Sequence, residues 1–365
     1  MSEWQTFCLK DLGKIVGGAT PSTNNPKNYG NKIAWITPKD LSTLQGCYIK
    51  KGSRSISRLG FKSCSCVLLP KHAILFSSRA PIGYVAIAKK RLCTNQGFKS
   101  IIPNKKIYFE FLYYLLKYHK DNISNIGGGT TFKEVSGATL GLFKVKIPPT
   151  YYEQQKIART LSILDQKIEN NHKINELLHT LAYKIYEYYF KYKPKNAKLE
   201  QIIIENPKSS IMVKNAQKTQ DKYPFFTSGD NILFYPKAII DGRNCFLNTG
   251  GNAGIKFYVG KASYSTDTWC ICANEFSDYL YLLLSSIKTH INQSFFQGTS
   301  LKHLQKNLLK KYPIYMPSVH EIKKFNQIIM PLLTLISINT RISKKLEQIR
   351  DFLLPLLLTQ QVKPQ

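Results

Sequence analysis

The residue patterns that could carry a reaction each lack an essential member. Ile147-Pro-Pro-Thr150 has the paired prolines of an amino-methyltransferase motif but not the amide or acid before them. Gly250-Gly-Asn-Ala-Gly254 lacks the lysine of a phosphate-binding loop. Glu321-Ile-Lys323 is half of a common nuclease motif, but its counterpart Glu153-Gln-Gln155 has no lysine. A first-turn glutamate that favours the helix dipole explains both better. The sequence therefore predicts no reaction centre.

Histidine and cysteine spacing gives no sign of a metal centre. His172 and His179 lie seven residues apart on a predicted helix, where surface positions explain them. Eight cysteines occur without a CxxC pair, and the pairs Cys64-Ser-Cys66 and Cys270-Ile-Cys272 fall in strand-like runs. Free thiols in a reducing cytoplasm are the interpretation we prefer over zinc or disulfides. We expect no metal and no cofactor on this chain.

Polar loops with basic residues point instead to nucleic acid. The chain has 52 Lys and Arg against 22 Asp and Glu, a formal charge of +30 that attracts polyanions. Lys and Arg beside small residues suit phosphates, and Asn and Gln amides can pair with adenine. Each residue alone is better explained as a turn former, but the whole set favours DNA. The predicted DNA-binding residues are Thr20, Ser22, Lys39, Ser78, Arg79, Asn95, Gln96, Lys99, Thr130, Lys133, Ser228, Arg243, Thr249, Asn252, Thr268, Gln297, Thr299 and Lys302.

Length and hydropathy fit a protein of two globular domains. At 365 residues, with 43% hydrophobic residues, the chain is longer than one ordinary domain. An anionic membrane is the alternative partner for the charge, but no apolar run approaches the roughly 20 residues of a transmembrane helix. Met1-Ser-Glu-Trp4 leads into mixed polar sequence rather than a signal peptide. We expect a cytoplasmic protein.

The two halves of the chain repeat one another. Gly129-Thr-Thr-Phe-Lys133 recurs 169 residues later as Gly298-Thr-Ser-Leu-Lys302, and Val145–Pro148 recurs as Ile314–Pro317. After a slip of one residue, a long helical pattern follows in both copies. The repeat extends weakly upstream, where Phe76–Gly83 resembles Leu247–Gly254 and Thr94–Phe98 resembles Thr266–Trp269. A shared plan with different exposed side chains is expected if two domains bind different ligands of one class.

Long helices are predicted from about Glu153 to Lys193 and from about Glu321 to Thr359. Apolar residues recur every three to four positions in both, which makes a narrow seam suited to a partner helix. About 40 helical residues span roughly 60 Å, too much for one small domain to cover, so we expect an antiparallel coiled-coil pair. Because proline removes a helical hydrogen bond, we expect a short helix to end near Met330 and the long one to begin at Pro331.

Asn171 and Asn339 interrupt the two seams at the same place in the repeat. The midpoints of two antiparallel helices meet at their pseudo-two-fold axis, which predicts that these residues lie close together and fix the register. The alternative, which the sequence leaves equally open, is that both face solvent.

Short strand-like runs and turns precede each helix. Val67–Leu69, Ala73–Phe76 and Tyr84–Ala88 in the first copy, and Asn244–Leu247 and Lys256–Val259 in the second, resemble strands. Tyr108–Tyr118 and Ser277–Ile287 predict one short helix in each copy. The fold class is therefore α/β, with twisted sheets in both globules. The predicted boundaries are a first globule over 1–150, a helix over 151–193, a second globule over 194–320 and a helix over 321–365.

Several motifs along the chain resemble those of the specificity subunits of Type I restriction–modification systems. Leu9–Lys14, Gly18–Ser22 and Ile36–Leu41 look like the start of that family's target recognition domain, and Ala80–Gly83 with Thr94–Phe98 look like its middle. The sequence Pro148-Pro149, Glu153–Ala158 and Ile163–Asp165 resembles the junction into its conserved helix. The second copy departs more, with His320-Glu-Ile-Lys323 at this junction.

The resemblance implies two target recognition domains on an antiparallel pair of helices, each reading half of a bipartite DNA site. It implies two modification subunits that bind S-adenosylmethionine and methylate adenine, and restriction subunits that cleave DNA with ATP and Mg²⁺. The helices would set the spacer between half-sites, about one DNA turn of roughly 34 Å. Two alternatives are an enzyme that methylates or cleaves DNA by itself and a coiled-coil scaffold for proteins.

Overall fold

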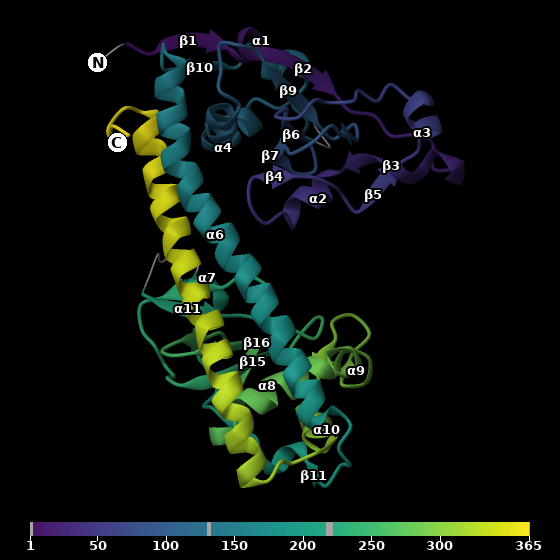
Figure 1. Cartoon of the computed structure of the whole chain (residues 1–365), viewed down its shortest axis with the longest axis vertical. Helices are drawn as coiled ribbons and strands as arrows, with labels where there is room; N and C mark the ends of the chain where they lie inside the picture. The colour runs from purple at the N-terminus through teal and green to yellow at the C-terminus, as the bar shows by residue number, and fades with distance from the viewer. Residues whose placement is uncertain (1–2, 130–132, 217–221, 365) are drawn as a thin grey trace. The chain divides into compact units, whose positions relative to one another are not determined.

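The structure is a computed structural model that describes residues 3–129, 133–216 and 222–364. It divides into unit 1, Met1–Asn170 with Lys344–Gln365, and unit 2, Asn171–Ser343. Each unit combines sheets and short helices with segments of two long helices (Figure 1), so the mixed α/β prediction is confirmed. Within the described ranges, we find no helix long and apolar enough to cross a membrane.

A five-stranded sheet in the order β2-β9-β6-β7-β4 forms the centre of unit 1. Its neighbours pair antiparallel except β4 and β7, which run parallel. A three-stranded sheet, β5-β3-β8, and the antiparallel pair β1–β10 complete the unit. The strands are β1 (Gln5–Cys8), β2 (Gly13–Gly17), β3 (Tyr29–Ile36), β4 (Tyr48–Ile49), β5 (Arg54–Ile56), β6 (Ile74–Ser78), β7 (Ile82–Ala88), β8 (Cys93–Thr94), β9 (Lys99–Pro103) and β10 (Lys144–Ile147).

Helix α4 (Phe109–Asn125) packs on β6 and β7 and closes the main core of unit 1 (Figure 1). Its residues Phe111, Leu112 and Leu116 are fully buried in one cluster with Ile74 and Phe76 of β6. The shorter helices are α1 (Leu9–Leu12), η1 (Pro26–Asn28), α2 (Pro38–Ser42), α3 (Arg58–Lys62) and α5 (Gly137–Leu142).

Unit 2 is built around a four-stranded antiparallel sheet in the order β12-β18-β15-β16. A three-stranded sheet, β14-β13-β17, and two strand pairs accompany it. The strands are β11 (Ala197–Lys198), β12 (Ile204–Glu205), β13 (Tyr223–Phe226), β14 (Leu233–Tyr235), β15 (Arg243–Asn248), β16 (Ile255–Val259), β17 (Ser263–Tyr264), β18 (Thr268–Cys272), β19 (Phe296–Gln297), β20 (His303–Leu304) and β21 (Pro313–Ile314). The helices are η3 (Leu199–Gln201), α7 (Val213–Ala216), η4 (Asn274–Phe276), α8 (Ser277–Ser286), α9 (Lys288–Ser294) and α10 (Lys306–Lys310).

The two units repeat one order of strand pairing. The set β2, β9, β6 and β7 corresponds to β12, β18, β15 and β16, and the parallel pair β3–β8 corresponds to β13–β17. Helices α4 and α8 confirm the two predicted short helices, although α4 extends to Asn125. Four of the five predicted strands form, whereas the run Val67–Leu69 makes only an isolated bridge from Leu69 to Leu92. The internal repeat is therefore one of topology as well as sequence.

The long helices are α6 (Tyr151–Tyr186), which continues as a π-helical turn η2 (Glu187–Lys191), and α11 (Val319–Leu358). The expected break at Pro331 is wrong, because α11 runs through it. The ring of Pro331 is exposed, while Ile329, Leu333 and Ile336 around it are buried in the core of unit 2. Each such side chain contributes about 1.5–3 kcal/mol, which together exceeds the roughly 3 kcal/mol cost of an internal proline.

Asparagines link α6 and α11 within unit 2. The Asn171 amide donates to Ser343 Oγ at 3.2 Å, and the Asn339 amide donates to Asn175 Oδ1 at 3.0 Å. The α11 partner number falls by four as the α6 number rises by four, so these segments run antiparallel. Each asparagine thus bonds one turn away from its predicted partner, and Asn339 is only 8% exposed, which excludes the solvent-facing alternative for that residue.

Candidate nucleic-acid interface

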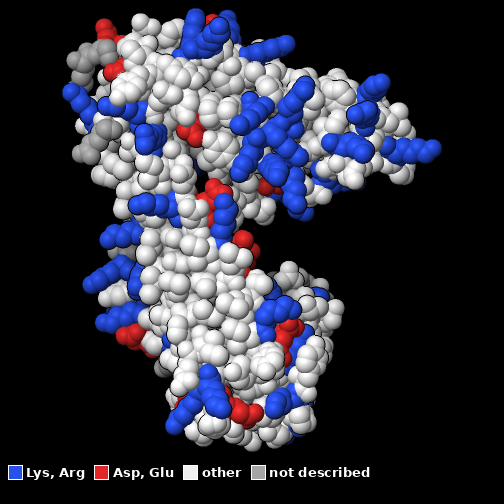
Figure 2. Space-filling model, in the orientation of Figure 1, with Lys and Arg blue, Asp and Glu red and all other residues white. Residues whose placement is uncertain are grey.

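The positive charge is divided unequally between the units. Unit 1 contains 30 Lys and Arg against 11 Asp and Glu, whereas unit 2 contains 22 against 11. Figure 2 shows basic side chains gathered on unit 1 over α2, α3 and strands β3–β5. We call this set the basic patch; its members are exposed and, among the described residues, form no ion pair: Lys32, Lys39, Lys50, Lys51, Arg54, Arg58 and Lys62.

Only Lys39 of the basic patch was among the predicted DNA-binding residues. Lys50, Lys51, Arg54, Arg58 and Lys62 recur within 13 residues, so the signal was present in the sequence as a local charge run. The Arg54 guanidinium lies 4.5 Å from the centre of the Tyr29 ring, which holds it in place without neutralising it. Exposed cations of this kind suit a phosphate backbone.

Two loops of unit 1 bring together residues that are far apart in sequence. The Thr20 hydroxyl donates to Gln96 Oε1, and both side chains are exposed. A Cβ on Gly18 would lie 2.1 Å from the Asn95 carbonyl oxygen, so only glycine lets the two loops approach. Asn95 Oδ1 accepts from the Gly97 N–H at 3.0 Å, which is a turn-forming role. Thr20 and Gln96 remain candidates for base edges.

Glu134 engages two predicted phosphate contacts of unit 1. Its carboxylate lies 3.4 Å from Arg79 Nη1 and 3.3 Å from Lys99 Nζ. All three side chains keep partial exposure, so phosphate and Glu134 would compete for the same two cations. Lys133, Ser22 and Lys39 are exposed, whereas Thr130 lies outside the described residues.

Three predicted contacts are interior residues instead. Ser78 is fully buried and its hydroxyl donates to the Gly97 carbonyl, while Thr268 donates to the Phe226 carbonyl. The Arg243 guanidinium donates to both carboxylate oxygens of buried Asp278 and, at 3.0 Å, to Thr334 Oγ1. These side chains are committed to internal acceptors, so we remove them from the candidate set.

The remaining candidates of unit 2 lie on connected loops. Ser228 and Thr249 both donate to the Asp267 carbonyl, the latter at 2.7 Å. The Gly251 N–H donates to the Lys302 carbonyl at 2.9 Å, which ties the loop of Asn252 to that of Lys302. Asn252, Gln297, Thr299 and Lys302 are exposed on these loops. They could contact DNA without rearranging the core.

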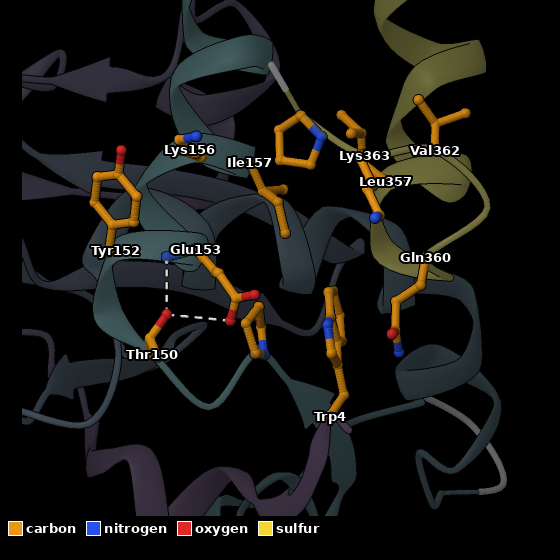
Figure 3. Close-up of a pocket in the computed structure, with 12 residues that line it drawn as sticks. Trp4, Thr150, Tyr152, Glu153, Lys156, Ile157, Leu357, Gln360, Val362 and Lys363 are labelled. Atoms are coloured by element: carbon orange, nitrogen blue, oxygen red, sulfur yellow. Dashed lines mark hydrogen bonds between the residues drawn. The ribbon is translucent and has the colours of Figure 1, made fainter. Parts of the chain in front are cut away.

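The first turns of the long helices explain the glutamates of the partial nuclease motif. Glu153 caps α6, because its N–H donates to Thr150 Oγ1 at 3.2 Å and its carboxylate accepts from the same hydroxyl at 3.1 Å (Figure 3). Glu321 makes the same exchange with Ser318, and the backbone hydrogen bond from Ser318 lowers the pKa of its carboxyl. Both lie in the first turn of their helices, as the sequence predicted, and both also take part in a capping exchange.

A cavity of about 510 Å³ lies beside the start of α6 in unit 1 (Figure 3). Trp4, Ile157, Leu357 and Val362 give it apolar walls, and its carboxylate is that of Glu153, which already caps the helix. Elsewhere in the described ranges, no three His, Cys, Asp or Glu side chains form a possible metal site. All eight cysteines are free.

Comparison with known proteins gives a family for this arrangement. Residues 1–180 and 195–348 each match the sequence model of the Type I restriction modification DNA specificity domain. The two matched segments together cover most of the chain, and each contains one of the two repeated sheets.

Individual relatives agree with the domain match. The Type I restriction enzyme MjaIX specificity subunit of Methanocaldococcus jannaschii is 33% identical, over 97% of this chain and 92% of the relative. A putative type I specificity subunit of Mycoplasma genitalium is 23% identical over 75% of this chain and 72% of its own length. The crystal structure of an S subunit from M. genitalium shares the fold, with a TM-score of 0.66 at 18% identity over 98% of this chain and 96% of that one. Fold, repeat and sequence agree, and the chain belongs to the Type I restriction modification DNA specificity family.

Proposed function

We propose that this chain is the DNA-specificity subunit of a Type I restriction–modification complex, in which each unit reads one half of a bipartite site. The observation that best supports this proposal is that the two units share one strand topology but differ in the side chains of their exposed loops. Each unit supports its loops on its own sheet, and the two sheets share one strand order. The exposed side chains on these loops differ, since unit 1 presents Thr20 and Gln96 whereas unit 2 presents Asn252 and Gln297. Two scaffolds with different exposed amides suit two different base sequences.

We also propose that α6 and α11 form an antiparallel coiled-coil pair with pseudo-two-fold symmetry. A shift of 168 residues converts Asn171 into Asn339 and Asn175 into Ser343. Replacing each residue by its counterpart in the repeat therefore converts the Asn171–Ser343 hydrogen bond into the Asn339–Asn175 hydrogen bond. Such an exchange is what a two-fold relation between the helices would produce.

The chain would direct chemistry that its partners perform. Apolar side chains stay exposed on both helices, among them Ile174, Leu177 and Leu181 of α6 and Ile342 and Ile349 of α11. Their three-, four- and seven-residue spacing suits partner helices, which we assign to two modification subunits. Those subunits would bind S-adenosylmethionine, and restriction subunits would use ATP and Mg²⁺. This chain would be non-catalytic, hold no cofactor and work in the cytoplasm.

Methylation mapping tests this function directly. Genomic N6-methyladenine is mapped in cells with and without the gene, and a plasmid copy restores the gene as the control. We expect one bipartite motif to lose methylation and to regain it with the plasmid. Unchanged methylation, or methylation of DNA by the purified chain alone, would contradict the proposal.

Gel shifts separate DNA recognition from the scaffold alternative. The chain with its modification subunits should bind random-sequence DNA in a salt-dependent way and the mapped motif more tightly. A scaffold that uses its charge only for solubility would bind weakly or without salt dependence.

A further inference from the structure

A half-buried lysine lies beneath the candidate loops of unit 2. Lys256 is on β16, opposite Phe246 of β15, and was not among the predicted DNA-binding residues. Its ammonium donates to the Thr227 carbonyl at 2.7 Å and to Asn248 Oδ1 at 3.2 Å. Burial lowers the pKa of this ammonium, while nearby Asp230 and Asp267 oppose that shift. The cation is thus turned inward, toward the backs of two loops.

Through Asn248, Lys256 determines how the loop of Asn252 is held. Because Asn248 Oδ1 accepts from Lys256, its Nδ2 points the other way and donates to the Asn252 carbonyl at 3.1 Å. A Cβ on Gly254 would lie 2.3 Å from Asn248 Nδ2, so the loop fits around this amide only with glycine at that position. Asn248 is 7% exposed, which leaves it little freedom to turn.

Through Thr227, the same cation holds the loop of Ser228. The carbonyl that accepts from Lys256 belongs to the residue directly before Ser228. Ser228 Oγ in turn accepts from the Thr249 N–H at 3.2 Å, and both hydroxyls donate to the Asp267 carbonyl. One half-buried charge therefore lies behind two loops, one that carries Ser228 and one that carries Thr249 and Asn252.

Unit 1 has no cation at the corresponding place. The repeat aligns Phe76 with Leu247, and therefore also Leu75 with Phe246. Leu75 pairs across the sheet with Ala86, and Phe246 pairs with Lys256, so Ala86 is the counterpart of the lysine. Ala86 is fully buried. The lysine is thus a property of one unit and not of the shared scaffold.

We propose that Lys256 is a positioning residue that sets the sequence specificity of unit 2 by fixing two loops in one conformation. The inference rests on the proposed DNA-specificity function and adds the residue that organises one of its two readers. Lys256 acts through Asn248 and the Thr227 carbonyl. Its loss should therefore relax one half-site and leave the other unchanged.

The test compares Lys256→Met with the matched control Lys261→Met, which removes an exposed charge from the same unit. Each variant is assembled with its modification subunits, and its methylation motif is mapped. Binding is then measured on the cognate site and on sites with one altered base in either half. For Lys256→Met we expect discrimination in one half-site to fall about tenfold, comparable to the effect of a mismatched base pair. Discrimination in the other half-site, and both half-sites of the control, should be unchanged.

Two further variants keep the test decisive if Lys256→Met does not assemble. Asn248→Asp still accepts from Lys256 but cannot donate to the Asn252 carbonyl, so it should relax the same half-site. Lys256→Arg should retain most of the discrimination. Equal weakening on every sequence, with a salt slope reduced by about one, would identify Lys256 as a phosphate contact and overturn the proposal. An unchanged motif would also overturn it. If the wild-type chain directs no bipartite motif, the proposed function itself fails.

Discussion

The two units fill equivalent positions of their cores with different chemistry. In unit 1, Asp165 of α6 accepts from Tyr114 of α4 and from Arg350 of α11, each at 2.7 Å. A shift of 168 residues relates Asp165, Tyr114 and Arg350 to three buried apolar residues of unit 2, Leu333, Leu282 and Ala182. Equivalent positions of the repeat can thus hold either a charged cluster or an apolar one. The contact between α6 and α11 therefore does not require the ion pair.

The opposite difference occurs at the starts of α4 and α8, where the ion pair belongs to unit 2. Glu110 of α4 accepts from the hydroxyls of Tyr48 and Tyr108, whereas the corresponding Asp278 of α8 is paired with Arg243. At this position unit 2 has an interior cation where unit 1 has tyrosine hydroxyls, and the exposed basic patch belongs to unit 1. We infer that unit 1 contributes more of the general attraction to phosphate and that unit 2 depends more on its internal hydrogen bonds.

The largest effect is expected from Arg350→Ala. The substitution leaves Asp165, whose side chain is 8% exposed, without its cation and should lower the free energy of unfolding by about 3–5 kcal/mol. Adding Asp165→Leu and Tyr114→Phe, which makes the cluster apolar as in unit 2, should recover at least half of the loss. Urea unfolding followed by tryptophan fluorescence measures both. A triple variant no more stable than Arg350→Ala would show that the units are not interchangeable here.

Arg243→Met should have a smaller and pH-dependent effect. Burial raises the pKa of Asp278, and Arg243 opposes that rise, so its loss raises the pKa further. A carboxyl with a higher pKa in the folded state binds more protons when folded, so stability is gained as pH falls and lost as pH rises. We expect a loss of about 2–3 kcal/mol at pH 7, partly regained at pH 5.

Urea midpoints across this pH range measure the effect. Adding Asp278→Asn should flatten the pH profile relative to Arg243→Met alone. A single variant whose profile runs parallel to the wild type would contradict the assignment.

Neutralising the basic patch should weaken DNA binding without changing the motif. For Lys50→Gln, Lys51→Gln and Arg58→Gln together, the salt slope should fall by nearly three if each cation meets one phosphate. The control replaces Lys195, Lys323 and Lys324, three exposed lysines of unit 2, by glutamine. Gel shifts over a range of salt concentrations compare the two. Equal effects would mean that the basic patch contributes only net charge.

Glu134→Gln should have the smallest effect, and in the opposite direction. Removing the carboxylate frees Arg79 and Lys99 for phosphate, so affinity should rise by roughly two- to fivefold with a steeper salt slope. Asp121→Asn, an exposed change in the same unit, is the control. Weaker binding would indicate that Glu134 holds its loop in place instead of competing with DNA.

Much of the fold could be predicted because its signals are local. Helical spacing placed α6 and α11 to within a few residues, and the repeat anticipated two related sheets. The break at Pro331 was wrong because tertiary burial of Leu333 and Ile336 outweighs a local preference. The basic patch was visible as a charge run, but the candidates were chosen from loops rich in small residues, so most of the patch was missed.

By itself, the sequence determined two copies of one scaffold, two long helices and a strongly basic chain without a catalytic motif. Periodicity, repeats and net charge are properties of the chain, independent of how it folds. Only the tertiary structure decided which polar residues face solvent. Arg243 and Arg79 both sit beside strand ends, yet one is committed to a buried carboxylate and the other keeps partial exposure. Whether such a side chain is buried or exposed depends on the acceptor nearest to it in space, which can lie far away along the chain.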